Sequence, residues 1–178
     1  MTEAVVIEES GVRFGPFDRD RLFQIEHSDI HKRAGKGIKT VEFIYLTERK
    51  NLLFVEAKNT CPNILNREES KAKHKKYEDY YTDITDKFID SVNMFAATAM
   101  GRNGKDLNIG SQIVSSTYGE IGFKLILVIS EAEEAWLSGP KAELESRLLR
   151  LRKIWRADVL VLNAEMAKTL GIAKENFA

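Results

Sequence analysis

The sequence contains little cysteine, which cross-links a chain, and little proline, which interrupts helices and strands. It has one cysteine, Cys61, and three prolines among 178 residues. A single cysteine excludes an intramolecular disulfide, which suits the reducing environment of the cytosol. Cys61 lies just after Lys58 and next to Pro62, and no basic partner for its thiol is evident, so we interpret it as a half-buried loop residue in preference to a reactive thiol.

An excess of charge of one sign is also missing. Lysine and arginine together number 27, as do aspartate and glutamate, and the formal net charge is zero. Proteins that coat nucleic acid are usually basic, so we do not expect tight non-specific binding to nucleic acid. A basic cleft that is balanced by acidic residues elsewhere stays compatible with this composition.

Long apolar runs are absent as well. The first residues have neither the basic region nor the apolar stretch of a signal peptide. The longest apolar run, residues 125–129, is far too short to span a bilayer. We therefore expect no membrane partner and a cytoplasmic location.

The chain has the size and composition of one globular domain. It is 43% hydrophobic and 30% charged, and it shows no repeat or linker. We predict a single domain over residues 1–178, with an N-terminal extension at 1–21 and a core at about 22–163.

Propensity and periodicity predict alternating strands and helices. This order predicts an α/β fold, in which helices cover a mixed sheet. Residues 18–25 fit either a short helix or a strand. The expected strands cover residues 5–7, 41–46, 52–58, 121–129 and 159–162, and the expected helices cover 68–100, 140–155 and 164–170.

The strands at 41–46 and 52–58 form a predicted hairpin that gathers charged residues at one end. A symmetric register about its turn places Glu42 opposite Glu56, and such opposed residues share a face. Lys58 lies on the same face as Glu56 because strand side chains alternate. The same register pairs Ile44 with Phe54 and Leu46 with Leu52.

Two neighbouring carboxylates repel each other and need a cation between them. Mg²⁺ or Mn²⁺ suits such a site, because these ions prefer oxygen ligands and keep several waters. A metal ion held there can polarise a scissile phosphate and acidify a bound water. A nearby lysine can orient that water or stabilise the charge of the transition state.

The segments Val-Glu-Phe-Ile-Tyr-Leu (41–46) and Leu-Leu-Phe-Val-Glu-Ala-Lys (52–58) resemble the hairpin of the PD-(D/E)xK nuclease superfamily. This superfamily includes restriction endonucleases and Holliday-junction resolvases. The resemblance implies a restriction endonuclease-like three-layer sandwich, with a mixed sheet flanked by helices in the order α-β-β-β-α-β. It also implies that Glu42, Glu56 and the Ala57 carbonyl hold the metal, and that Lys58 assists the attacking water.

Two features depart from the superfamily pattern. The first acid is usually an aspartate, often after a proline, whereas Glu42 follows Val41. Many members also carry an acid on a helix before the hairpin. Glu26 is the candidate here for this further metal ligand.

An alternative interpretation of Glu42, Glu56 and Lys58 is a surface ion-pair ladder, which contributes little to stability. Against it, the predicted register places apolar residues on the same face, so that face should be largely buried. These apolar residues are Ile44, Leu46, Leu52 and Phe54.

Two lysine-rich segments flank the hairpin and are candidates for contacts with a phosphate backbone. A solvated surface is the alternative for each segment alone. The candidates are Lys36 and Lys39 before the hairpin and Lys73, Lys75 and Lys76 after it.

Two functions follow as hypotheses. The first is a divalent-metal-dependent nuclease that hydrolyses phosphodiester bonds, in DNA in preference to RNA. The second is a catalytically inactive protein of the same fold, which serves as a binding or assembly subunit. A homodimer and a separate partner protein both remain open.

Overall fold

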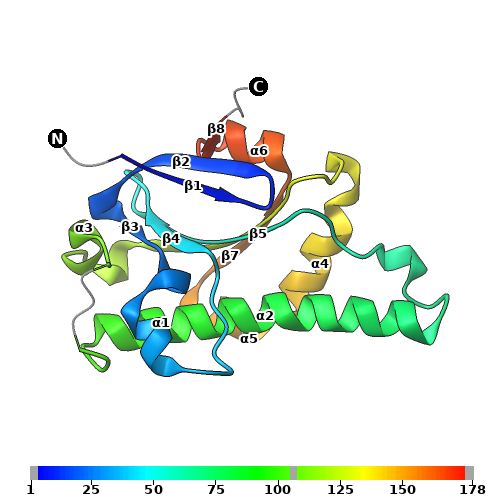
Figure 1. Ribbon diagram of the computed structural model, residues 1–178, viewed down its shortest axis with the longest axis horizontal. Coiled ribbons are helices and arrows are strands. Elements are labelled where there is room, and N and C mark those ends of the chain that lie inside the picture. Colours follow the sequence, from blue (N-terminus) through cyan, green and yellow to red (C-terminus); the bar gives the residue numbers. More distant parts are fainter. Residues whose placement is uncertain (1–3, 105–107, 175–178) are drawn as a thin grey trace.

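The computed structural model describes residues 4–104 and 108–174 (Figure 1). Its strands form two sheets. The larger has five strands in the order β3-β4-β5-β6-β7, and the smaller has three in the order β1-β2-β8. The described chain is therefore an α/β protein, as predicted.

The five-stranded sheet is mixed. Strands β3, β4 and β5 are antiparallel neighbours, whereas β5, β6 and β7 run parallel. The parallel pairs are joined through helices, as such connections require. The strands span Leu22–Phe23 (β3), Phe43–Leu46 (β4), Asn51–Lys58 (β5), Gly122–Ile129 (β6) and Asp158–Leu162 (β7).

Three helices cover one face of this sheet: α2 (Lys71–Ala99), α4 (Ser138–Arg147) and α5 (Leu149–Trp155). Helix α2 runs the length of the molecule below the sheet in Figure 1. It buries an apolar stripe at steps of three and four, the spacing of one face of an amphipathic helix. This stripe consists of Tyr77, Tyr81, Ile84, Phe88, Val92 and Phe95. No helix in the described ranges is long and apolar enough to cross a bilayer.

The opposite face is covered mainly by the smaller sheet, whose strands are β1 (Ala4–Glu9), β2 (Val12–Asp18) and β8 (Ala173–Lys174). Helix α6 (Ala164–Thr169) adds to this layer. Phe14 and Phe17 from β2 pack on Phe43. The sheet is therefore flanked by helices on one face, but on the other face mainly by strands.

Strand β2 was missed because its glycine and proline are typical of a turn. Pro16 is exposed within β2, and the pairing of β1 with β2 shifts register between Val5 and Ile7. Such an irregularity accommodates a residue that lacks an N–H group. Residues 4–18 thereby form part of a packed layer.

The remaining predictions agree with the structure except in detail. The helix expected at 140–155 divides at Leu148 into α4 and α5. Residues 18–25 contain a 3-10 turn, which Asp18 caps, and the short strand β3. Two short helices were not predicted: α1 (Asp29–Ala34), capped by Ser28, and α3 (Ser111–Val114).

Candidate functional site

The candidate site lies at the carboxyl end of β5, on the face that α2 covers. Glu56 points toward the helix side, whereas Val55 and Ala57 pack on the opposite face, beneath the three-stranded sheet. Glu56 is 0% exposed and Lys58 is 29% exposed. A fully buried carboxylate needs a cation or hydrogen-bond donors, so the surface ion-pair alternative does not describe Glu56.

The predicted hairpin register is correct. Ile44 pairs with Phe54, and Leu46 pairs with Leu52. Strand β4 begins at Phe43, so Glu42 lies directly before the strand, and its N–H donates to the Val55 carbonyl at 3.0 Å. Glu42 and Glu56 lie close together because both contact the ammonium of Lys87.

Helix α2 fixes the segment that leads into Glu42. The backbone N–H of Val41 donates to Ser91 Oγ at 2.8 Å, and that of Lys39 donates to Asp90 Oδ2 at 3.0 Å. Both acceptors are consecutive residues of α2. The position of Glu42 therefore depends on the packing of this helix as well as on the hairpin.

Glu26 joins the two glutamates from the 3-10 turn η2 (Ile25–His27). His31 Nδ1 lies 2.8 Å from the Glu26 carbonyl oxygen, which ties η2 to α1. Burial, a hydrogen bond with the Glu26 carboxyl group and the charge of Glu56 together raise the pKa of Glu42 to about 9. The predicted third acid thus lies beside Glu42, on a turn rather than a helix.

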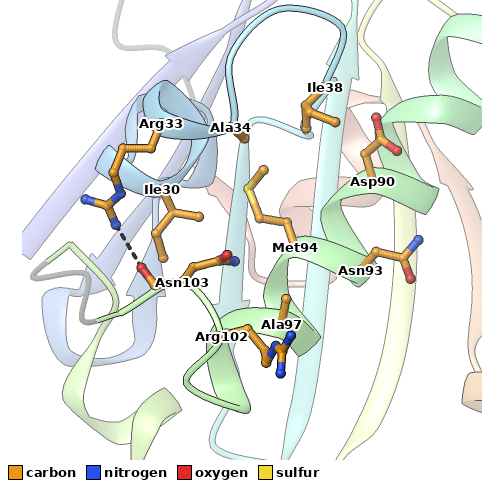
Figure 2. A pocket seen from close by; sticks show the side chains of 10 residues that line it. All are labelled: Ile30, Arg33, Ala34, Ile38, Asp90, Asn93, Met94, Ala97, Arg102 and Asn103. Atoms are coloured by element: carbon orange, nitrogen blue, oxygen red, sulfur yellow. Dashed lines mark hydrogen bonds between the residues drawn. The ribbon is translucent and has the colours of Figure 1, made fainter.

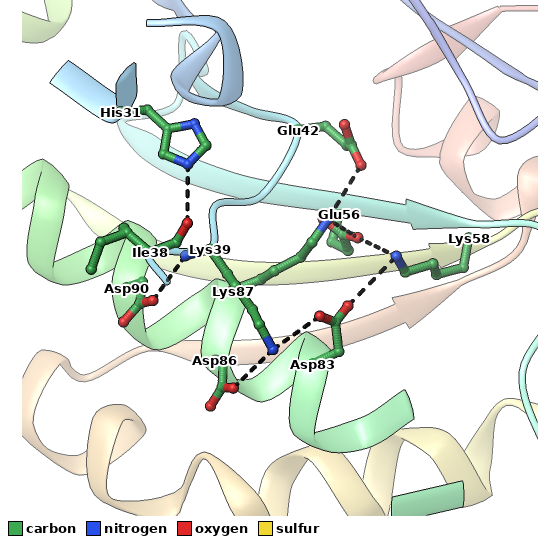
Figure 3. A network of polar contacts seen from close by, with 10 residues as sticks. All are labelled: His31, Ile38, Lys39, Glu42, Glu56, Lys58, Asp83, Asp86, Lys87 and Asp90. Atoms are coloured by element: carbon green, nitrogen blue, oxygen red, sulfur yellow. Dashed lines mark hydrogen bonds and ion pairs between the residues drawn. The ribbon is translucent and has the colours of Figure 1, made fainter. Parts of the chain in front are cut away.

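Two lysines share the buried carboxylate (Figure 3). Glu56 Oε1 is 2.8 Å from Lys87 Nζ and 3.0 Å from Lys58 Nζ. Burial raises the pKa of Glu56 even though both lysines oppose the shift. Burial also lowers the pKa of Lys87, but the charge and hydrogen bond of Glu56 outweigh it, so the pKa is raised overall.

Further aspartates of α2 extend the cluster toward solvent. Asp83 lies 3.9 Å from Lys58 and 3.2 Å from Lys39, which also contacts Asp86 at 3.2 Å. Hydrogen bonds with Asp86 and Asp83 raise the pKa of Lys39. Figure 3 shows Asp83 and Asp86 of α2 facing Lys58 at the end of β5 and Lys39 in the loop before β4.

The donor set suits a hard divalent cation, since it consists of oxygens. Glu56 Oε2 is buried and has no hydrogen-bond partner in the described part of the chain. Acidic side chains outnumber lysines in the cluster. Even so, no three His, Cys, Asp or Glu side chains within residues 4–104 and 108–174 are arranged to hold a metal ion. Lys87 Nζ instead lies between Glu42 Oε1, at 3.8 Å, and Glu56 Oε1, at 2.8 Å.

The Ala57 carbonyl, a predicted metal ligand, lies where β5 extends beyond its neighbour β4. It accepts a hydrogen bond of 3.1 Å from Ser10 Oγ. A carbonyl oxygen has two lone pairs, so this bond leaves capacity for another ligand.

The predicted nucleic-acid contacts divide into two groups. Lys39 belongs to the site cluster. Lys73 and Lys75 lie on the first turns of α2, where they pair with Glu69 and Asp79. The other two predicted lysines, Lys36 and Lys76, are exposed. Lys36 follows α1, and Lys76 lines a small pocket of about 150 Å³ together with Arg67 and Lys73.

A larger pocket of about 520 Å³ adjoins the site, between α1, the loop after it and the C-terminal half of α2 (Figure 2). Asp90 is common to this pocket and to the cluster around Glu56. Arg33 and Arg102 lie at the pocket, and Arg33 donates to the Asn103 carbonyl at 3.2 Å. Its floor is apolar, with Ile30 and Met94 buried.

Lys87, Asp83 and Ser10 were not predicted from the sequence. Lys87 precedes the core residue Phe88 and follows Ile84 by three positions. A lysine so close to the apolar stripe of a long helix signals a half-buried ammonium that needs an acidic partner. Nothing in the sequence signals the contact of Ser10 with Ala57, 47 residues away.

Comparison with protein-family models, with curated proteins and with solved structures gives no match for this chain. The resemblance of the hairpin to the PD-(D/E)xK superfamily therefore depends on the chain's own residues.

Proposed function

We propose that the protein is a divalent-metal-dependent nuclease that cleaves phosphodiester bonds, in DNA in preference to RNA. The observation that carries this proposal is the buried Glu56 at the end of β5, with Glu42 and Lys58 beside it and one oxygen unpartnered among the described residues. Such a carboxylate is costly to bury, and a cation-binding role accounts for its place.

The topology supports the proposal. Three antiparallel strands lead through a long helix to a parallel fourth strand, as the restriction endonuclease-like fold would require. One detail differs from the expected order, because α1 lies between β3 and β4 rather than before the first strand.

In this proposal, Glu56 and Glu42 hold Mg²⁺ or Mn²⁺, together with the Ala57 carbonyl and Glu26. The metal would supply charge stabilisation at the scissile phosphate and a more acidic water. Lys58, which is partly exposed and lies 3.0 Å from Glu56 Oε1, orients the attacking water. Its ammonium also stabilises negative charge that develops on the phosphate oxygens.

The surroundings of the site offer cations for a phosphate backbone. Arg33 and Arg102 line the pocket that shares Asp90 with the site, and guanidinium groups suit phosphate geometry. Lys36, Lys73, Lys75 and Lys76 remain predicted contacts. Because the net charge is zero, we expect weak, salt-sensitive binding that is confined to this region.

The test is cleavage of supercoiled plasmid and of single-stranded oligonucleotides with Mg²⁺ or Mn²⁺. We expect Glu56→Gln and Lys58→Ala each to reduce the rate by at least about a hundredfold, the size of the loss when one group that stabilises transition-state charge is removed. Glu120→Gln is the matched control, because it removes a lysine-paired carboxylate at the opposite end of β5. Equal cleavage by wild type and Glu56→Gln would show that the activity does not arise at this site.

A second candidate is a catalytically inactive binding or assembly subunit. One observation favours it: Lys87 and Lys58 already compensate the charge of Glu56. Calorimetric titration with Mn²⁺ separates the two candidates. Binding that Glu56→Gln abolishes supports the nuclease, and the absence of binding at millimolar Mn²⁺ supports the inactive subunit.

A further inference from the structure

We propose that Lys87 is an internal cation that competes with the metal, so that a divalent ion enters the site only when the Lys87 ammonium leaves it. This inference rests on the proposed metal site of Glu42 and Glu56. It adds a means of regulation, because the site would be held closed by a residue of the same chain.

The position of Lys87 carries the argument. Its Nζ contacts Glu56 Oε1 at 2.8 Å and Glu42 Oε1 at 3.8 Å, so it lies between the two carboxylates. Figure 3 shows the side chain extending from α2 toward both of them. Lys58 contacts Glu56 but reaches outward to Asp83, and therefore does not occupy the same place.

Because the site is buried, the Lys87 ammonium and a metal ion cannot occupy it together. The side chain of Lys87 is 15% exposed, that of Glu42 is 10% exposed and that of Glu56 is 0% exposed. A site so enclosed cannot hold an ammonium and a divalent ion between the same oxygens, because like charges at that distance repel strongly.

The helix offers Lys87 an alternative position. Asp83 precedes it by four residues and Asp90 follows it by three, so both lie on the same side of α2. Lysine has a flexible stem and a compact ammonium, which can exchange partners by rotation about its side-chain bonds. Release from Glu56 therefore leaves Lys87 near other carboxylates rather than without a partner.

The experiment measures Mn²⁺ affinity by isothermal titration calorimetry for wild type, Lys87→Met and Lys58→Met. Both substitutions remove one positive charge beside Glu56, but only Lys87→Met clears the position between the carboxylates. We expect Lys87→Met to bind Mn²⁺ at least about tenfold more tightly than wild type, and Lys58→Met to differ from wild type by less than about threefold. The rise in melting temperature with Mn²⁺ should follow the same order.

Four outcomes are distinguishable. Tighter binding by Lys87→Met alone, which Glu56→Gln in the same background removes, supports the inference. Equal affinities for wild type and Lys87→Met at a Glu56-dependent site overturn it and leave the metal site intact. Equal gains for both lysine variants also overturn it, since general electrostatics would suffice. If neither wild type nor a folded Lys87→Met binds Mn²⁺, the proposed metal site itself is wrong.

Discussion

Helix α2 carries lysines in two settings that look alike in the sequence and differ in the structure. Near its start, Lys73 and Lys75 are exposed and pair with Glu69 and Asp79, four residues away. In its middle, Lys87 is mostly buried and pairs with Glu56, which lies 31 residues away on β5. The first setting is local and solvated, whereas the second joins a helix to a sheet.

The exposed and the buried lysines of α2 differ in how much their ion pairs contribute to stability. In an exposed ion pair, each charged group is also well solvated and the attraction is screened by water. The pair therefore contributes little to the free energy of unfolding. The Lys87 ammonium offsets a carboxylate that has lost all its water, so its removal leaves a buried charge. The part of α2 that is richest in lysine is therefore the part where each lysine contributes least to stability.

The largest effect that we expect is a dependence of stability on pH in the absence of metal. The pKa of Glu42 is raised from 4.5 to about 9, so between these values the folded protein binds more protons than the unfolded chain. The free energy of unfolding should therefore fall as the pH rises through this window, by at most about 1.4 kcal/mol per pH unit for one proton. Glu56, whose pKa is also raised by burial, acts in the same direction.

Urea unfolding between pH 5 and pH 9 in the presence of a chelator measures this dependence. Glu42→Gln should flatten the profile, and the exposed control Glu120→Gln should preserve it. A wild-type stability that rises across the window, or a slope in Glu42→Gln as steep as that of wild type, would contradict the raised pKa of Glu42.

The next effect is the coupling between Lys87 and Glu56. We expect Lys87→Met to lower the free energy of unfolding by about 2–3 kcal/mol, less than for a fully isolated pair because Lys58 still contacts Glu56. In a double-mutant cycle with Glu56→Gln, the coupling energy should be about 2 kcal/mol. Chemical denaturation of the four proteins at pH 7 measures it, and additive effects would show that the pair contributes no specific stability.

The sequence was sufficient for the hairpin and for the clustering of Glu42, Glu56 and Lys58, because strand alternation and register depend on neighbours along the chain. It was sufficient for α2 as well, whose stripe repeats over many turns. It was insufficient for Lys87 and Ser10, because their partners lie 31 and 47 residues away and are set by the packing of separate elements. Strand β2 was missed for another reason, since Gly15 and Pro16 lie inside it.

The smallest effect that we expect concerns the exposed pair Lys75 and Asp79. Their side chains are 74% and 62% exposed, so the coupling energy from the cycle of Lys75→Ala and Asp79→Ala should be below about 0.5 kcal/mol. It should fall further when salt is added, because exposed pairs are screened. Lys75 is also a predicted phosphate contact. If it makes that contact, Lys75→Ala should reduce the salt dependence of oligonucleotide binding: the slope of log affinity against log salt concentration should become smaller by about one. A coupling as large as that of Lys87 with Glu56 would mean that burial does not distinguish the two regions of α2.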